Sequence, residues 1–401
     1  MSGIRNEELV QKALITTDAL ASQGKLNPAQ ADKFIDYVID ITGLKNNARV
    51  VRFRNEEMLI EKIGVGRRVA VPAVEAQAPA TRRGVNTARV TLHPQEIMVP
   101  FEIGDTFREI NVEGEAVEEH IIKMMATQLA IDMESLYIEG DTLGRADLES
   151  NLIEGGSATQ VIRDSYLAMF AGWLRLSDGG SSHIVDALNQ NIGSNLFSRA
   201  INAMPAKFKR NRADLRFFTS LDLEQNYRER VSTRATAAGD TALGATQPLT
   251  PFGTPLLPYP LYPFQYREVE HVTLVNAATP AALRRRPVAS VVVTLATLGS
   301  TPTTPFIETT DYTVDYAAGT VTKVGAAIPD GTLVKVTYAA NPTVLLTHMN
   351  NLIIGIGRDI RIEKDRDIFR RTNQYAITVK VAVEVEETDA MVKLVNIGVG
   401  V

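Results

Sequence analysis

The sequence predicts a mixed α+β protein, and three segments carry that prediction. Residues 114–140 have the clearest helical pattern, because apolar side chains recur every four residues from Val117 to Met133. Residues 375–385 alternate between apolar and other side chains, as expected of a long strand with one buried face. Residues 268–341 contain short strand-like runs separated by Gly, Pro, Asp and Thr turns, which predicts a small β-sandwich.

The length, charge and cysteine content of the chain exclude several classes of protein. The chain has 401 residues, enough for two or three domains, and 42 Lys and Arg against 47 Asp and Glu give a net charge of −5. This balance argues against a protein whose main task is to neutralise nucleic-acid phosphates, although a local basic patch remains compatible with it. The chain has no cysteine, which excludes disulfides, zinc–thiolate sites and thiol nucleophiles. No apolar signal core begins the chain and residues 288–298 are too short to span a bilayer, so we expect no membrane association.

The N-terminal residues predict a helical arm. Residues 4–22 and a second segment that follows Pro28 have the apolar spacing of amphipathic helices. Two such helices are too small to hold a core alone, so they must dock on something else. They either cap their own chain or reach a neighbouring subunit, and the residues leave both alternatives open.

The stretch from Gly64 to Gln95 cannot build its own core, since Leu92 is its single leucine and it has no aromatic or isoleucine. Residues 58–63 and 96–103 are predicted to be the outgoing and returning strands on either side of it. The stretch is therefore either disordered or a β-hairpin that packs on another chain, and the alternation of residues 89–92 favours the hairpin. Its basic side chains, which also deter uncontrolled strand pairing, are Arg67, Arg68, Arg82, Arg83 and Arg89.

The central part of the chain predicts alternating helices and strands. The expected elements are a helix at 161–176, a helix at 196–204, a buried strand at 215–219 and a short helix at 222–230. Trp173, the only tryptophan, is predicted to anchor a core or an interface. The proline-punctuated residues 251–264 are interpreted as a rigid connector that packs on the body through its aromatics, in preference to a proline-recognition peptide.

Residues 358–371 hold ten charged side chains in fourteen residues. Such a run is usually a solvated hairpin tip, where each surface ion pair contributes only about 0–1 kcal/mol. The mixed signs also suit a site where copies of the chain meet and pair opposite charges. The arginines that we consider for such contacts are Arg358, Arg361, Arg366, Arg370 and Arg371.

The usual signatures of catalysis are missing from the sequence. It contains no phosphate-binding loop of the Gly-x-x-x-x-Gly-Lys type, no His-Glu-x-x-His and no Gly-x-Ser-x-Gly. The segment 355–357 lacks the third glycine of a dinucleotide loop, and the five histidines have no metal-ligand spacing. Asp132 and Glu134 lie on different faces of the predicted helix. We therefore expect no catalytic, cofactor-binding or metal-binding residue, and no enzyme.

The order of these segments resembles the major capsid proteins of tailed bacteriophages, which have the Hong Kong 97-like fold. No single motif is sharp, and the order of the segments is the evidence. The segments that carry the resemblance are the basic loop segment 57–103, the helix 114–139 ending in Ile138-Glu139-Gly140-Asp141-Thr142, residues 215–220, residues 234–240 with 252–256, and residues 351–397.

The resemblance implies a division of the chain into an N-terminal arm, an E-loop that lies over a neighbouring subunit, a peripheral domain with a spine helix, and an axial domain. The inserted β-sandwich interrupts this pattern. The implied boundaries are 1–56 for the arm, 57–103 for the E-loop, 104–186 and 358–401 for the peripheral domain, 187–267 and 342–357 for the axial domain, and 268–341 for the insertion.

The resemblance also implies a function. The chain would assemble through pentamers and hexamers into the icosahedral head shell of a phage, enclosing double-stranded DNA without sequence-specific binding. The implied partners are other copies of the chain, a portal, a separate scaffolding protein and a decoration protein. The implied location is the virion, after assembly in the host bacterial cytoplasm.

One departure from the family concerns covalent cross-links, which some members form through an E-loop lysine. Residues 64–95 contain no lysine and the nearest is Lys62, so we expect a shell held by non-covalent burial. Two rival interpretations stay open at this point: a bacterial encapsulating shell protein, and a structural protein of a phage tail or baseplate.

Overall fold

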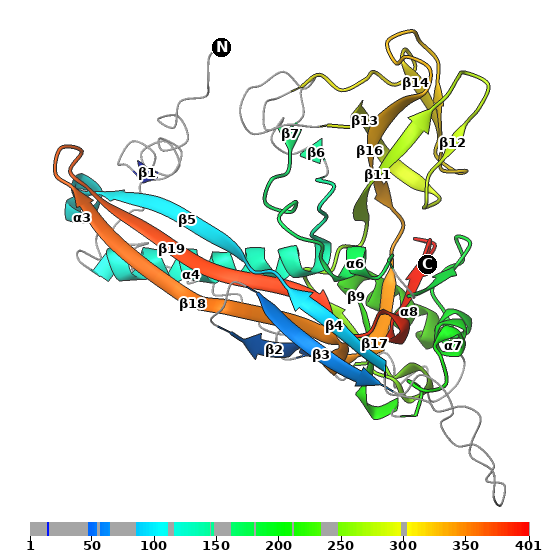
Figure 1. The fold of residues 1–401 in the computed structure, drawn as a ribbon, viewed down its shortest axis with the longest axis horizontal. Helices are drawn as coiled ribbons and strands as arrows, with labels where there is room; N and C mark the ends of the chain where they lie inside the picture. The colour runs from blue at the N-terminus through cyan, green and yellow to red at the C-terminus, as the bar shows by residue number, and fades with distance from the viewer. Residues whose placement is uncertain are drawn as a thin grey trace, which may run out of the picture.

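The computed structural model describes residues 14–15, 47–53, 57–64, 86–110, 116–144, 146–147, 162–179, 182–210, 212–233, 248–297 and 303–400. Within these residues the chain is a mixed α+β structure. A long sheet backed by a helix extends from a compact body, and a separate group of strands stands above that body in the view of Figure 1.

The extended part is a five-stranded sheet, called here the long sheet, with the strand order β1-β5-β19-β18-β2. Strands β18 and β19 form an antiparallel hairpin, and β19 also pairs with β5, so that Tyr375 lies opposite Lys364 on one side and Phe101 on the other. The bounds are β1 Leu14–Ile15, β2 Arg49–Arg52, β5 Gln95–Gly104, β18 Leu352–Asp367 and β19 Thr372–Val385.

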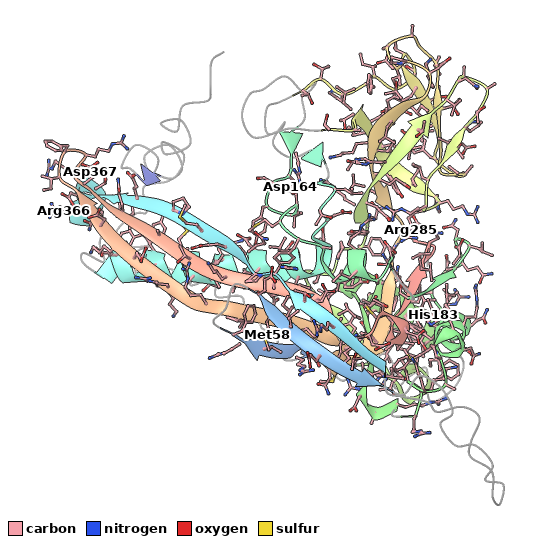
Figure 2. All side chains as sticks on the ribbon, viewed as in Figure 1. Met58, Asp164, His183, Arg285, Arg366 and Asp367 are labelled. Carbon is pink, nitrogen blue, oxygen red and sulfur yellow. The ribbon has the colours of Figure 1, made fainter. Side chains whose placement is uncertain are left out.

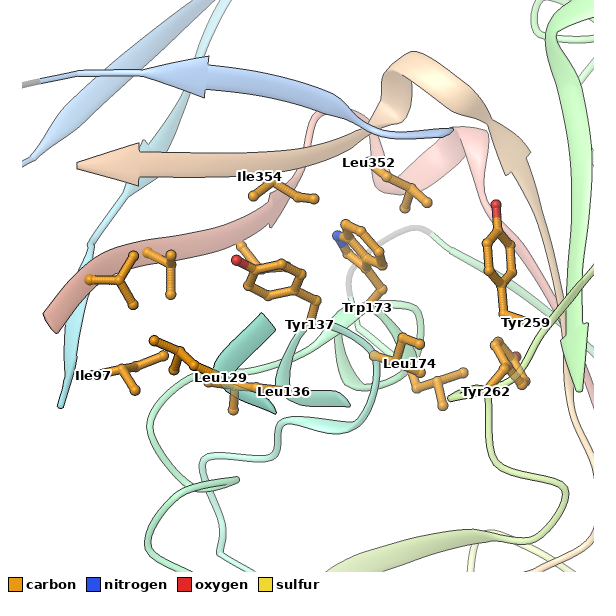
Figure 3. Packing of buried hydrophobic residues seen from close by; sticks show 14 of the residues in the cluster. Ile97, Leu129, Leu136, Tyr137, Trp173, Leu174, Tyr259, Tyr262, Leu352 and Ile354 are labelled. Carbon is orange, nitrogen blue, oxygen red and sulfur yellow. The ribbon is translucent and has the colours of Figure 1, made fainter. Parts of the chain in front are cut away.

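One face of the long sheet is covered by the predicted spine helix, α4 (Ala116–Glu139), with α3 (Asp105–Ile110) before it. At about 1.5 Å per residue, a helix of this length spans about 36 Å. Alternate residues of β19 from Tyr375 to Val385 are buried on this face, as the sequence predicts. Trp173 is buried in the same core, beside Tyr137 and Leu174 (Figure 3), which confirms its predicted role as an anchor.

The compact body contains a second five-stranded sheet, the body sheet, in the order β10-β9-β17-β20-β8. Helices α7 and α8 pack against it through a core that includes Phe197, Phe217 and Tyr227. The bounds are β8 His183–Asp186, α7 Ser194–Ala203, β9 Leu215–Ser220, α8 Leu221–Ser232, β10 Leu256–Tyr259, β17 Val344–His348 and β20 Val392–Val395. Tyr259 and Tyr262 of the proline-punctuated segment are buried against the body, as expected.

Residues 266–340, called here the β-unit, form two three-stranded sheets with the orders β11-β16-β13 and β12-β15-β14. The unit has a core of its own, centred on Val293, Val321, Val336 and Tyr338. Its strands confirm the predicted run of short strands, although the first begins at Tyr266. The bounds are β11 Tyr266–Leu274, β12 Ala281–Ala282, β13 Val288–Leu295, β14 Tyr312–Asp315, β15 Thr320–Lys323 and β16 Thr332–Ala340.

A two-stranded hairpin of β3 (Met58–Gly64) and β4 (Asn86–Leu92) lies over the other face of the long sheet. Its base packs there through a small core that includes Leu92, Phe53 and Ala382. Gly355 makes this contact possible, because a Cβ at that position would lie 2.9 Å from the Phe53 ring and 3.4 Å from the Ala382 methyl. The segment 355–357 lacks the third glycine of a dinucleotide loop. In the structure, its Gly355 is a packing position between the β3–β4 hairpin and the long sheet.

Four sequence predictions are wrong. The hairpin, expected to pack on another chain, packs its base on the long sheet of its own chain, where Leu92 is buried. The returning strand of the hairpin is β4, not residues 96–103, which join the long sheet as β5 instead. The predicted helix at 161–176 is limited to α6 (Trp173–Leu176), while residues 162–163 form strand β7 with β6 (Ala146–Asp147). Leu14 and Ile15, predicted to be helical, form strand β1 beside β5; the remainder of the predicted helical arm up to residue 46 lies outside the described residues.

Candidate inter-subunit surfaces

The turn between β18 and β19, residues 368–371, is called the tip, and it presents two apolar side chains to solvent. Phe369 is 100% exposed and Ile368 is 77% exposed. The turn is fixed from within, because the Asp367 carboxylate accepts hydrogen bonds from the backbone N–H of Phe369 at 2.9 Å and of Arg370 at 3.0 Å. A fixed turn that holds a phenylalanine fully in water is a preorganised contact for an apolar partner surface.

The strands that carry the tip are anchored to the two helices beneath them. Arg366 donates to the Asp105 carboxylate at 3.0 Å, at the start of α3, and the Asp105 N–H donates to the Arg371 carbonyl at 3.0 Å. Lys364 pairs with Glu118 of α4, and this hydrogen bond raises the pKa of Lys364. Arg366 and Asp367 mark this end of the long sheet in Figure 2. These contacts connect the residues on either side of the tip to α3 and α4.

The arginines predicted from the charge run fall into two groups. Arg366, Arg370 and Arg371 lie at or beside the tip, whereas Arg358 and Arg361 lie farther along β18. Their charges are largely met within the chain, by the pairs Arg358–Glu96, Arg361–Glu363 at 2.8 Å, Arg366–Asp105 at 3.0 Å and Arg370–Asp367 at 3.8 Å. The hydrogen bond from Arg358 holds the pKa of the Glu96 carboxyl below its usual range.

Sequence reasoning selected these charges and missed the two apolar residues between them. The signal was present, since Ile368 and Phe369 are adjacent in the middle of a run of ten charges. Apolar residues in such a run have no core to join when the flanking residues form a solvated turn. Their position indicates contact with another molecule more directly than the arginines do.

Of the loop arginines predicted to make inter-subunit contacts, Arg89 is the one within the described residues. It lies in β4, and its side chain is 3.7 Å from that of Glu61 in β3. Both of these side chains are exposed, so the pair contributes little to stability. The base of the hairpin carries a further pair, Lys62 with Glu387 at 3.6 Å. The predicted contacts at Arg67, Arg68, Arg82 and Arg83 lie outside the described residues.

The β-unit meets the body through buried charged side chains. Arg285 is 4% exposed and pairs with Asp178 at 2.5 Å and with Glu268 at 2.9 Å. Lys393 of β20 is fully buried, and it pairs with Asp178 at 2.9 Å and donates to the Leu174 carbonyl at 2.9 Å. Figure 2 places Arg285 where the β-unit joins the body.

Within this junction, burial and the neighbouring opposite charges shift the pKa values of the charged side chains in opposite directions. Burial raises the pKa of Glu268 and lowers the pKa of Lys393. Burial also works against ionisation of Asp178, but Lys393 and Arg285 together hold its pKa below the usual value. Because charges buried this deeply are costly unless they are paired, a movement of the β-unit that separated these pairs would be strongly unfavourable.

Among the described residues, no group of three or more His, Asp or Glu side chains is arranged to hold a metal ion. In the same part of the chain, no helix is long and apolar enough to cross a membrane.

Comparison with known proteins decides how these surfaces are interpreted. No protein-family model matches the sequence. The chain is 28% identical over 397 residues to the Bacillus subtilis (strain 168) protein named "Putative prophage capsid protein YqbE", a match that covers 98% of this chain and 99% of that protein. This chain is related to phage capsid proteins. The resemblance predicted from the order of its segments is confirmed.

Solved capsid structures share the fold over nearly the whole chain. A chain of the native GTA particle capsid covers 96% of this chain and is itself covered completely, with a TM-score of 0.53 and 12% identity. A chain of the satellite phage P4 procapsid covers 98% of this chain, and 98% of its own length is matched, with a TM-score of 0.50 and 11% identity. The α+β architecture of this chain is thus a fold that it shares with solved capsid chains.

Proposed function

We propose that the chain is the major capsid protein of a phage and builds its shell by self-association through pentamers and hexamers. The observation that carries this proposal is the preorganised tip, where Phe369 stands fully exposed at the end of an anchored hairpin. The relationship to a prophage capsid protein over nearly the whole chain supports it. A surface of this kind gains free energy only when another molecule covers it, and about 25 cal/mol is gained per Å² of apolar area buried.

The other elements take roles consistent with such a shell. The β3–β4 hairpin is the base of an E-loop that lies on an adjacent subunit, and the β-unit is an insertion that projects outward. Its outward position makes it a candidate attachment point for a decoration protein. The long sheet with α4 corresponds to the peripheral domain and the body sheet to the axial domain. The completed shell encloses double-stranded DNA without reading its sequence.

The proposal also covers where the particle assembles, with which partners, and how it is held together. Assembly takes place in the host bacterial cytoplasm, with a portal and a separate scaffolding protein as partners, and the mature protein resides in the virion. No residue between 64 and 95 is a lysine, so the shell is held by buried surface and not by a lysine cross-link from this loop.

The test is assembly of the purified chain with and without the apolar tip. We expect closed particles from the natural chain by negative-stain electron microscopy. We expect Phe369→Ser together with Ile368→Ser to shift the protein to smaller species in size-exclusion chromatography. The unfolding free energy should stay within about 0.5 kcal/mol, because neither side chain packs within the subunit.

The matched control is Ile307→Ser, which removes an exposed isoleucine from the β-unit without touching the tip. It should assemble as the natural chain does. Particles of normal yield and size from the double tip variant would contradict the assembly role of the tip. Failure of the natural chain to form any particle, with the other phage head components supplied, would contradict the proposed function as a whole.

A further inference from the structure

A strongly basic segment of the body is not used by any of the surfaces described above. It runs from the end of α7 into the start of β9 and is called here the basic loop; its basic residues are Lys207, Lys209, Arg210, Arg212 and, within β9, Arg216, with Asp214 as its single acidic residue. Lys207, Arg210 and Arg212 are exposed. Such a concentration of one sign is unusual for a chain whose net charge is −5.

The basic loop is held against the body by specific contacts. The Nε2 atom of His348, at the end of β17, lies 2.8 Å from the Phe208 carbonyl oxygen. Lys207 pairs with Asp389 at 2.8 Å, and Lys209 donates to the Asn202 carbonyl at 3.0 Å. Arg210 and Arg212 have no ion-pair partner among the described residues. Two arginine charges therefore stand on a fixed loop, available to an external anion.

The position of the basic loop is opposite to that of the β-unit. Strand β17 begins at Val344, just after the last strand of the β-unit, and ends at His348, which contacts the loop. The basic loop and the β-unit thus lie at opposite ends of β17.

We infer that the basic loop binds the phosphate backbone of double-stranded nucleic acid, without regard to sequence. Phosphate contacts require cationic side chains in fixed positions and no apolar anchor. No large apolar side chain of the described loop residues is exposed, whereas protein–protein contacts depend on such anchors. This surface therefore favours nucleic acid over an acidic protein segment.

The inference deepens the proposed function, because it states which end of the subunit faces the contents of the shell. If the β-unit projects outward, the loop at the opposite end of β17 faces inward, where packaged DNA lies. The binding itself does not depend on assembly and can be measured on the unassembled chain.

The experiment measures binding of a fluorescent 30-base-pair DNA duplex to the unassembled chain by anisotropy, between 50 and 200 mM NaCl. The variant Arg210→Gln with Arg212→Gln should bind about tenfold more weakly at low salt. Its plot of log affinity against log salt should be less steep by about 1.8, because each lost phosphate contact removes about 0.9 from the slope. A second duplex of unrelated sequence should bind equally well.

The control variant, Arg286→Gln with Lys323→Gln, makes the same change in net charge on the β-unit and should bind DNA as the natural chain does. Equal weakening by both variants, or no measurable binding to either duplex, would overturn the inference. So would binding of a polyglutamate peptide in place of DNA, since that would identify an acidic protein as the partner. Particle formation is scored separately, so a failure of assembly is distinguishable from a failure of DNA binding.

Discussion

Arg285 illustrates how much a single buried charge can fix in this molecule. Its guanidinium lies between Asp178 of the body and Glu268 of the β-unit, and all three side chains are almost completely buried. A buried ion pair adds little net stability compared with apolar packing, but the loss of one partner leaves an uncompensated charge. The residue therefore determines orientation more than it determines the free energy of the natural fold.

We expect Arg285→Met to lower the unfolding free energy by about 3–5 kcal/mol, because Glu268 loses its main partner inside the protein and Asp178 is left with Lys393 alone. Urea denaturation followed by circular dichroism would measure the change. The neighbouring Arg286→Met, whose side chain is 58% exposed, should cost no more than about 0.5 kcal/mol. Equal effects of the two substitutions would mean that the junction is not closed to water.

At the scale of elements, periodicity predicted the strands and helices whose burial is one-sided. Residues 375–385 and α4 are examples, because alternation and four-residue spacing report directly on which face is buried. The segment before Trp173 is apolar but forms turns instead of a helix, since Asp164 accepts a hydrogen bond from the Leu167 N–H at 3.0 Å. A local side-chain bond of this kind competes with helix formation, and an apolar pattern does not reveal it.

Strand partners were harder to predict than strands. Residues 96–103 are a strand as expected, but they pair with β19, nearly 280 positions later in the chain, and not with β3. Periodicity identifies the buried face of a strand and carries no information about its neighbour. The same reasoning explains the candidate site: the charges were visible in the sequence, whereas the anchoring of the tip on α3 and α4 depends on non-local pairing.

The contact between β18 and the β3–β4 hairpin gives a prediction for Gly355. A valine there would press on Phe53 and Ala382, so Gly355→Val should cost about 1–3 kcal/mol in unfolding free energy. Phe53→Ala should recover part of this loss, and the double variant should be more stable than the two separate changes predict. Strict additivity in urea denaturation would show that the two side chains do not compete for the same space.

The hairpin also allows a sharper test of the E-loop proposal. A deletion of residues 66–85 keeps β3 and β4, including the buried Leu92, and removes only the segment beyond them. We expect a folded monomer with unchanged circular dichroism that no longer forms shells, because its contact with the adjacent subunit is lost. Shells of normal size from this deletion would refute the role of the loop between subunits.

At the scale of the whole molecule, the absence of cysteine permits a direct test of the outward position of the β-unit. A single cysteine at Ile307→Cys should react with a bulky maleimide on intact particles, at the same rate as on dissociated subunits. The contrasting position is Arg212→Cys on the basic loop, which should react only after dissociation. Protection of the β-unit cysteine in intact particles would place that end of the subunit inside the shell or between subunits.

The closed junction around Arg285 has a practical consequence for imaging and display. If a flexible linker joined the β-unit to the body, its density would be blurred when many copies are averaged. The buried ion pairs of Arg285 favour the same orientation of the β-unit on every copy. A peptide inserted at Ala317–Ala318, in the exposed turn between β14 and β15, should therefore repeat across the particle with regular spacing and direction. The particle would then present a foreign epitope as an ordered lattice.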